Sequence, residues 1–466
     1  MPFAGTFRVA AALCCCCIGS ARLAAQSPHV VDPREFGLEI PSGPIRDGNG
    51  KSIATADDDG EPVVAKLLVE VGDHRILILP DGRLVTRHRR DATSTERTFA
   101  PIERDALAAR LLATEFSGFK TNQTRRYLYL YNTSEEFALA TSRILETMFP
   151  GVANYAKAQK IEVTEPDVPL VVVMFRTEDD FQRYQRMPTG VVAYYNILDN
   201  RVVMYEESRL RSVKPELAIQ QSIATIAHEG AHQILHNIGV QKRLSRWPMW
   251  LSEGLAEFFA PTTFGSRLRW KGAGQVNDMR MFELEMYLKS RDSDQPNGQM
   301  IEQTVVAGRL TSTGYASAWS LTHYLAKSKR ASFNDYVREV SQLGPLEAFG
   351  EMVAPGIVPA NLDLFHKHFG DDLGDLNTRL VLHLKKLPYS DPFAEWPHFV
   401  ATVAVANGRR PKRDANIFHT PDMAEKWIRE ALETVDANQR SAAASEVRAF
   451  PNREIAARYA RQWLGQ

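Results

Sequence analysis

Residues 215–239 read PELAIQQSIATIAHEGAHQILHNIG and carry the boundary signals of one helix. Proline in the first turn has no amide to leave unpaired, and Glu216 suits the positive end of the helix dipole. Asn237 and Gly239 mark the stop. The segment therefore predicts a single helix packed against a core. Four apolar residues supply its packing surface: Ile223, Ile226, Ile234 and Leu235.

Two histidines on this helix are spaced for a shared cation. His228 and His232 enclose Glu229 in the pattern His-Glu-x-x-His. At i and i+4 the two imidazoles share one helix face, so both can reach a single ion. Neutral imidazole is a natural zinc ligand, and three protein ligands with a water molecule make an open, catalytic site. Glu229 would then activate that water as the catalytic base. The alternative is a pair of partly exposed helical histidines without a metal.

A second helix is expected to supply the third ligand. Residues 248–261 read PMWLSEGLAEFFAP and follow a basic loop. Glu253 would approach the same ion as His232 from this facing helix, and Gly254 would let the two backbones come close. Glu257, one turn later on the same face, can accept a hydrogen bond from a ligating imidazole and fix its tautomer.

The plainer interpretation of Glu253 and Glu257 is an exposed polar stripe, since glutamate is usually exposed. A carboxylate pair with no partner would be costly among apolar side chains. The two helices together therefore favour a metal site of His228, His232 and Glu253. The apolar residues that cover much of the second helix are Trp250, Leu251, Leu255, Phe258 and Phe259.

The two motifs resemble those of the gluzincin metallopeptidases, most closely the secreted, largely uncharacterised peptidase-MA-like families of bacteria. The resemblance covers roughly residues 127–325 and is specific in the two motifs. It implies a zincin-like domain that hydrolyses peptide bonds, in which two histidines and the downstream glutamate bind zinc and the inner glutamate activates water. The matching residues are His228-Glu229-Gly-Ala-His232 and Trp250-Leu-Ser-Glu253-Gly-Leu-Ala-Glu257.

The same resemblance suggests a role for Tyr315, and position along the helix suggests one for His236. Such enzymes commonly add a tyrosine or histidine that hydrogen-bonds the developing oxyanion, and the spacing of Tyr315 from Glu253 is similar to that of the tyrosine in the aminopeptidase branch. The alternative for Tyr315 is a core-packing phenol at the start of a helix over 316–330. His236, one turn beyond His232, is expected to support the site or the fold and not to bind the ion.

One segment departs from the aminopeptidases of this clan. Those enzymes carry Gly-x-Met-Glu-Asn, whose glutamate binds the substrate amine. The nearest counterpart, residues 190–196 (GVVAYYN), contains no acid. This difference weakens an aminopeptidase assignment, although a strand over 191–195 could offer an edge to an extended peptide.

Three functions stay open on the sequence. The first is an exported zinc peptidase that acts on a peptide or protein substrate. The second is a non-catalytic exported binding protein that keeps the zinc-site scaffold; the intact Glu229 argues against it, because a structural site has no use for that base. The third is a cell-envelope interaction protein whose C-terminal helices carry the function. No Gly-x-Ser-x-Gly elbow, no Gly-x-x-x-x-Gly-Lys phosphate loop and no mature cysteine nucleophile competes.

The first 25 residues are predicted to be a signal peptide, which implies a periplasmic or extracellular protein. Arg8 supplies a positive region, residues 9–18 (VAAALCCCCI) form a short apolar run, and residues 23–25 offer a cleavage site. A membrane-spanning helix needs about 20 apolar residues, so this run is too short to span. A lipoprotein anchor through Cys14–Cys17 is the alternative, disfavoured by Leu13 before it. All four cysteines lie here, so a mature chain would hold its metal with His, Asp and Glu.

Composition places the chain among soluble globular proteins. Of its 466 residues, 44% are apolar and 24% charged, and lysine plus arginine equals aspartate plus glutamate at 56 each. This balance gives no electrostatic reason to expect nucleic acid or anionic lipid as a partner. The length suggests two to four domains.

The pattern along the chain predicts an α+β fold. A hairpin at Asp81-Gly82 and a continuous apolar strand over 169–175 are its clearest β signals. The expected order is a signal peptide (1–25), a flexible arm (26–60), a small β unit (61–115), a zincin-like α/β catalytic domain (116–270), a helical domain that completes the cleft (271–395) and a C-terminal helical region (396–466).

Overall fold

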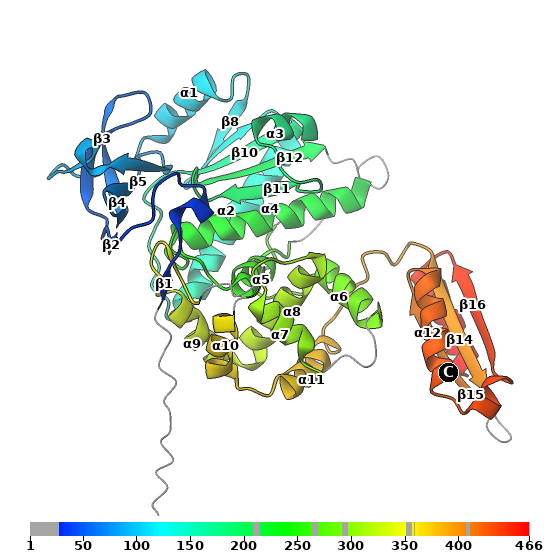
Figure 1. The fold of residues 1–466 in the computed structure, drawn as a ribbon. Coiled ribbons are helices and arrows are strands. Elements are labelled where there is room, and N and C mark those ends of the chain that lie inside the picture. Colours follow the sequence, from blue (N-terminus) through cyan, green and yellow to red (C-terminus); the bar gives the residue numbers. More distant parts are fainter. Residues whose placement is uncertain are drawn as a thin grey trace, which may run out of the picture.

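The computed structural model describes residues 28–207, 215–262, 269–290, 297–350, 357, 359–406 and 411–465. It is a mixed α+β fold, as predicted, with its larger sheets in the N-terminal part and mainly helices from residue 215 to residue 384 (Figure 1). The expected signal peptide, residues 1–25, lies outside the described residues. Within the described part of the chain, no helix is both long and apolar enough to cross a membrane.

A six-stranded antiparallel sheet forms the N-terminal unit. Its order is β6-β5-β4-β3-β7, and β2 pairs with β4. The predicted hairpin at Asp81-Gly82 is confirmed: Ile78 pairs with Leu84, and Gly82 has a φ of 89°, which glycine adopts without strain. The strands are β2 (Ile45–Asp47), β3 (Ser52–Ala56), β4 (Pro62–Val71), β5 (His74–Ile78), β6 (Leu84–His88) and β7 (Thr93–Ser94).

The expected flexible arm over 26–60 is wrong for the described part of that segment. β2 and β3 lie inside it, and Ile53 of β3 is fully buried. Between β3 and β4 the Asp57 carboxylate accepts the amides of Asp59 and Glu61, which makes a tight turn. The Pro, Gly and Asp residues of this segment therefore mark turns between short strands.

The N-terminal segment is also fastened to the distant helical part of the chain. β1 (His29–Val30) pairs antiparallel with β13 (Glu347–Ala348), and the amide of Val31 donates to the carbonyl of Leu346 at 2.8 Å. Leu38 and Ile40 share one apolar cluster with Leu244 and Leu346. This cluster anchors the β unit beside the loop that joins the two motif helices.

The central sheet has five strands in the order β11-β12-β10-β9-β8. β9, β10 and β12 are parallel, whereas β11 and β8 are antiparallel strands at the two edges. β10 is buried on both faces, as its apolar run predicts, because Val172 and Val173 belong to different core clusters. The strands are β8 (Lys120–Gln123), β9 (Tyr127–Tyr131), β10 (Leu170–Thr177), β11 (Ala193–Asn196) and β12 (Arg201–Glu207).

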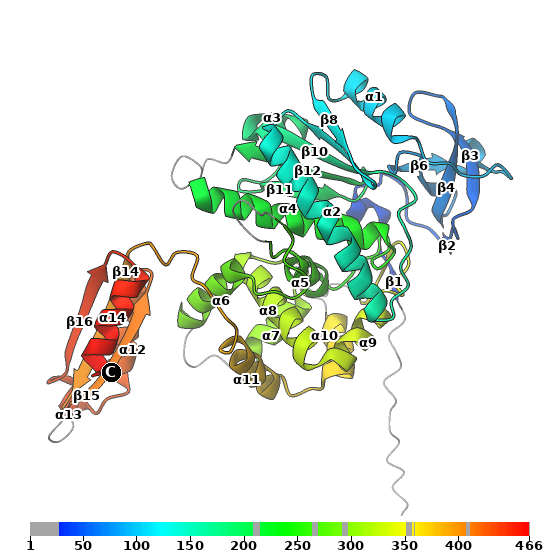
Figure 2. The same cartoon turned by 180° about the vertical axis from the view of Figure 1, so that it is seen from behind.

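Helices cover both faces of this sheet. α1 (Arg104–Thr114) and α3 (Glu178–Tyr184) contribute to one core cluster, and α2 (Glu135–Ala158) and α4 (Pro215–Asn237) to the other (Figure 2). α4 is the motif helix and runs beside the edge strand β11. The sheet thus supports the motif helix along its length.

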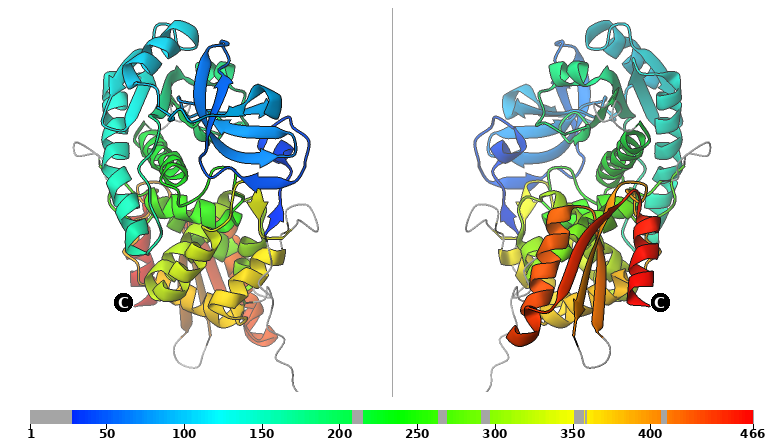
Figure 3. Two further views of the ribbon diagram at one scale, coloured as in Figure 1. Left: turned by 90° about the vertical axis from the view of Figure 1, so that its left-hand side faces the viewer. Right: turned by 90° about the vertical axis from the view of Figure 1, so that its right-hand side faces the viewer.

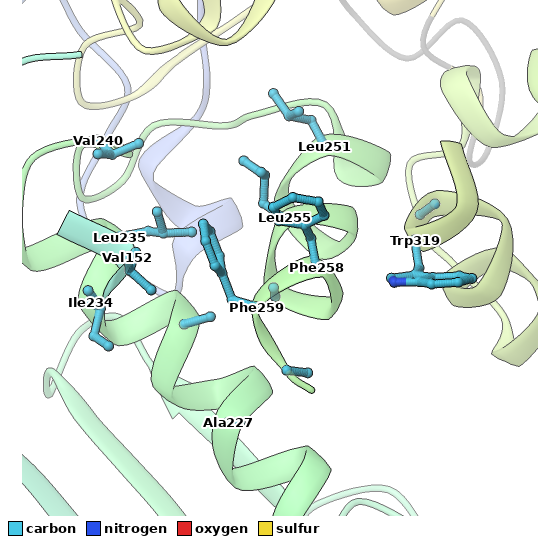
Figure 4. Packing of buried hydrophobic residues seen from close by; sticks show 14 of the residues in the cluster. Val152, Ala227, Ile234, Leu235, Val240, Leu251, Leu255, Phe258, Phe259 and Trp319 are labelled. Atoms are coloured by element: carbon cyan, nitrogen blue, oxygen red, sulfur yellow. The ribbon is translucent and has the colours of Figure 1, made fainter. Parts of the chain in front are cut away.

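The second motif helix, α5 (Met249–Phe259), joins the α/β part to the helical part. Figure 4 shows Phe259 of α5 pointing toward Leu235 of α4 and Val152 of α2, with Trp319 on the far side of α5. Two helices of this part, over 359–369 and 373–384, are separated at Gly370, whose φ is 87°. The helices of this part are α6 (Asp278–Ser290), α7 (Gln299–Val306), α8 (Ser312–Ser328), α9 (Arg330–Val340), α10 (Pro359–Phe369) and α11 (Leu373–Leu384).

The helices expected over 396–466 are present, but they share this region with a sheet that the sequence did not predict. A three-stranded antiparallel sheet in the order β15-β14-β16 forms there, with α12 and α14 packed on it (Figure 3). Val400 contacts the cluster under α14 and Ala401 the cluster under α12, so the helices cover opposite faces. The elements are β14 (His398–Val405), β15 (Lys412–Phe418), α12 (Pro421–Glu433), α13 (Ala437–Arg440), β16 (Ala444–Phe450) and α14 (Arg453–Leu464).

Gly254 permits a close approach, but of a different pair of helices than expected. A Cβ at this position would lie 2.2 Å from Thr322 Oγ1 and 2.7 Å from the Ala318 carbonyl oxygen, both on α8. The glycine therefore lets α5 lie on α8 and not on α4.

The substitution Gly254→Ala should lower the free energy of unfolding by about 1–3 kcal/mol, because the new methyl group overpacks a contact with backbone atoms. Gly374→Ala on α11 is the matched control, since its nearest neighbour, Asp372 Oδ1, is 3.3 Å away and belongs to a side chain. Both variants gain the helix propensity of alanine. Urea denaturation measures the difference, and equal stability of the two variants would contradict this packing.

Candidate metal centre

Side-chain hydrogen bonds hold the motif helix in a fixed rotation on the sheet. Gln233 Nε2 donates to the carbonyls of Val171 and Asn200 at 3.1 and 2.9 Å, and Asn237 Nδ2 donates to Asn200 Oδ1 at 2.7 Å. A Cβ on Gly230 would lie 2.2 Å from Leu145 Cδ2, so α4 also packs closely on α2. These contacts turn the histidine face of α4 toward α5.

The three predicted ligand atoms converge. His228 Nε2 lies 3.1 Å from Glu253 Oε2, His232 Nε2 lies 3.4 Å from the same oxygen, and the two Nε2 atoms are 3.3 Å apart. Ligands at zinc distances of about 2.0–2.2 Å in a tetrahedron would lie about 3.4 Å from one another. The residues present therefore fit a small tetrahedral divalent ion, and they form one of the two groups with metal-ligand geometry among the described residues.

The charge of Glu253 is stabilised within this group. Burial raises the pKa of its carboxyl, but the imidazoles of His232 and His228 outweigh burial and hold the pKa well below its usual range. A carboxylate and two ring nitrogens thus share one small, largely buried volume. Such a donor set is typical of zinc and similar ions.

The Glu257 carboxylate contacts His228 at Nδ1, the ring nitrogen that faces away from the ligand group. Glu257 Oε1 lies 3.0 Å from His228 Nδ1, in an electrostatic contact that is not a well-aligned hydrogen bond. Arg280 of α6 donates to Glu257 Oε1 at 2.7 Å, and Asn277 donates to Glu257 Oε2 at 2.9 Å. Although burial raises the pKa of Glu257, Arg280 and His228 lower it to about 2, so this side chain is a carboxylate.

Arg280 and Asn277 carry no motif signal in the sequence. Arg280 resembles any surface arginine with a helical partner three residues on, Glu283. Only the fold brings its guanidinium to Glu257. The only hint in the sequence is that Glu257 needs a cation if it is buried.

Glu229 faces the edge strand of the central sheet. Its Oε2 accepts the amide of Tyr195 in β11 at 2.8 Å. Burial and the nearby carboxylate of Glu253 raise the pKa of Glu229, and the two imidazoles only partly oppose this shift. Glu229 therefore lies beside the ligand group without belonging to it.

Tyr315 reaches the same site from the first turn of α8. Its ring centroid is 6.1 Å from that of His228, and the Arg280 guanidinium lies 5.3 Å above its ring. Burial and the carboxylates of Glu253 and Glu229 raise the pKa of Tyr315. The phenol thus keeps its proton and can act as a hydrogen-bond donor.

His236 lies outside the ligand group. Its Nδ1 is 3.0 Å from the carbonyl oxygen of Gln241, and its ring stacks on Tyr195 at a centroid distance of 5.5 Å. Burial, with the charges of His232 and Arg243, lowers the pKa of His236 to about 3. A neutral imidazole here supports the end of α4 and the edge strand.

Comparison with known proteins adds one match. A family model described as a protein of unknown function (DUF1570) matches residues 222–347. The matched segment includes the part of α4 that carries His228 and His232, all of α5 and α6, and Tyr315. No curated protein matches the chain.

Replacing Glu257 with glutamine should weaken zinc binding by about 10–100-fold, because the carboxylate that orients His228 is lost. Competition against a chelating dye measures the affinity. Glu283→Gln is the matched control, since Glu283 also pairs with Arg280 but has no contact with either histidine. Equal affinity of the Glu257 and Glu283 variants would show that Glu257 has no supporting role.

Proposed function

We propose that this chain is an exported zinc-dependent metallopeptidase of the gluzincin type. The observation that carries the proposal is the triangle of His228 Nε2, His232 Nε2 and Glu253 Oε2, with sides of 3.1–3.4 Å. Glu229 beside the triangle is the feature that a purely structural metal site would not need. The signal peptide that the sequence predicts at residues 1–25 supports a periplasmic or extracellular location.

The three ligands, Glu229 and Tyr315 would divide the steps of hydrolysis among them. Zinc held by the three ligands would polarise the scissile carbonyl and acidify a water molecule. Glu229 takes a proton from the attacking water and delivers it to the leaving amine. The Tyr315 hydroxyl donates a hydrogen bond to the oxygen on which negative charge develops.

The edge strand β11 supports a peptide as the substrate. Among the described residues, β11 pairs with β12 alone and leaves its other edge toward α4. An extended peptide could add to such an edge by backbone hydrogen bonds, which brings its scissile bond toward Glu229. The absence of an acid in residues 190–196 disfavours recognition of a free amino terminus.

The substitution Glu229→Gln should retain bound zinc and lower the rate of peptide hydrolysis by about 10²–10⁴-fold, the usual contribution of a general base. Mass spectrometry of cleavage in an unbiased peptide library measures the rate. Glu136→Gln on the exposed face of α2 is the matched control and should cleave like the parent chain.

Two outcomes would contradict this assignment. A zinc-bound parent chain that cleaves nothing in the library would favour the alternative of a non-catalytic exported binding protein. A parent chain with no zinc after loading would remove both zinc-based functions and leave an interaction protein.

The substitution Tyr315→Phe should lower kcat by about 10²–10³-fold, as expected for the loss of one oxyanion donor, and should leave KM and zinc content nearly unchanged. Tyr324→Phe, on the same helix α8, is the matched control. Steady-state kinetics on one cleaved library peptide measures both constants. An unchanged kcat would mean that Tyr315 only packs against His228.

A further inference from the structure

A second cluster of ligand-type side chains lies at the start of the C-terminal sheet. Asp391 precedes β14, His398 is its first residue, and His419 follows β15. The Nε2 atoms of His398 and His419 lie 3.3 and 3.0 Å from Asp391 Oδ2. Their side chains are 0%, 10% and 3% exposed for His398, His419 and Asp391, so water reaches the cluster little.

Two of these side chains are held as metal ligands usually are. His398 Nδ1 lies 2.8 Å from the carbonyl oxygen of Trp396, which accepts its proton, and this contact holds the ring with Nε2 toward Asp391. Asp391 Oδ1 accepts the amide of Phe393 at 2.8 Å, and Asp391 Oδ2 accepts from Arg453 at 2.5 Å. His419 Nε2 lies 3.0 Å from the same oxygen, so Arg453 and His419 both contact Oδ2.

This arrangement brings ring nitrogens of two histidines to one carboxylate oxygen. His398 Nε2 and His419 Nε2 lie 3.3 and 3.0 Å from Asp391 Oδ2. His419 Nδ1 is buried and has no hydrogen-bond partner among the described residues. The space between the three ligand atoms suits a cation, since the separations of 3.0 and 3.3 Å match those in the His228 group.

We propose that Asp391, His398 and His419 form a second site for a first-row divalent ion such as zinc, separate from the His228 site. Two imidazoles and one carboxylate suit such ions, and water would complete the coordination. This inference does not depend on the proposed peptidase function.

An ion in the second site would stabilise the contact between the C-terminal unit and α6. The same helix carries Arg280, which pairs with Glu257 beside the His228 site. Phe282 of α6 packs on His419 at 4.8 Å and on Phe393 at 4.4 Å between ring centroids. Lys289, also on α6, donates to the carbonyl of Ile417 at 2.8 Å. The ion would therefore act structurally, at the junction of α6 with residues 391–453.

Metal counting on the purified full chain tests the proposal. After loading with Zn²⁺ and gel filtration, the parent chain should contain about two ions, because each ligand group holds one. The double variant His228→Ala/His232→Ala leaves the second site intact and should still hold about one ion. A double variant that holds none would overturn the proposal, whatever the parent chain does as a peptidase.

Variants of the second site give the converse result. His419→Asn should reduce the parent count from about two ions to about one, and the remaining ion should disappear in combination with His228→Ala/His232→Ala. His366→Ala is the matched control, since His366 lies on α10 outside both groups and should leave the count unchanged. An unchanged count for His419→Asn would overturn the proposal. If that variant fails to fold, the His228/His232 variant alone decides.

Discussion

The structure depends on keeping one carboxylate charged inside the protein. Moving an ion of this size out of water costs several kcal/mol even after relaxation, and the cost is offset only where opposite charge and hydrogen bonds surround it. Glu253 meets this condition through His228 and His232 on the facing helix. The central sheet and the core hold α4 and α5 at the separation that allows Glu253 to contact His228 and His232.

The supporting contacts extend beyond the two motif helices. Glu257, one turn further along α5, is a second buried carboxylate that needs an opposite charge. Arg280 of α6 supplies that charge. α6 also carries Phe282 and Lys289, which contact the C-terminal unit. One helix thus connects the polar network behind the first metal group to the region around Asp391.

The parts of the fold predicted correctly are those with local signals. The Pro215 and Gly239 boundaries, the i and i+4 spacing of the histidines, the apolar run of β10 and the turn at Asp81-Gly82 need no distant partner to be recognised. The errors concern short strands with distant partners. β16 pairs with β14 across α12, and β3 gains its burial from β4, so their sequences alone look like loops or helices.

In the candidate site, too, the residues with local signals were predicted and those that depend on distant partners were not. His228, Glu229, His232 and Glu253 follow from spacing, and the structure brings them together with Tyr315. Arg280, Asn277 and the helix-orienting Gln233 act through residues that are far away in sequence. Gly254 was recognised as a close-approach residue, but the choice of α8 as its neighbour depends on tertiary packing.

The central claim is that His228, His232 and Glu253 bind one zinc ion together. A crystal of the zinc-loaded chain, measured on both sides of the zinc absorption edge, tests it most directly. We expect an anomalous difference peak at about 2.0–2.2 Å from Nε2 of both histidines and from a carboxylate oxygen of Glu253. Zinc in the crystal with no peak at this position, or with Glu253 beyond bonding distance of the ion, would contradict the account.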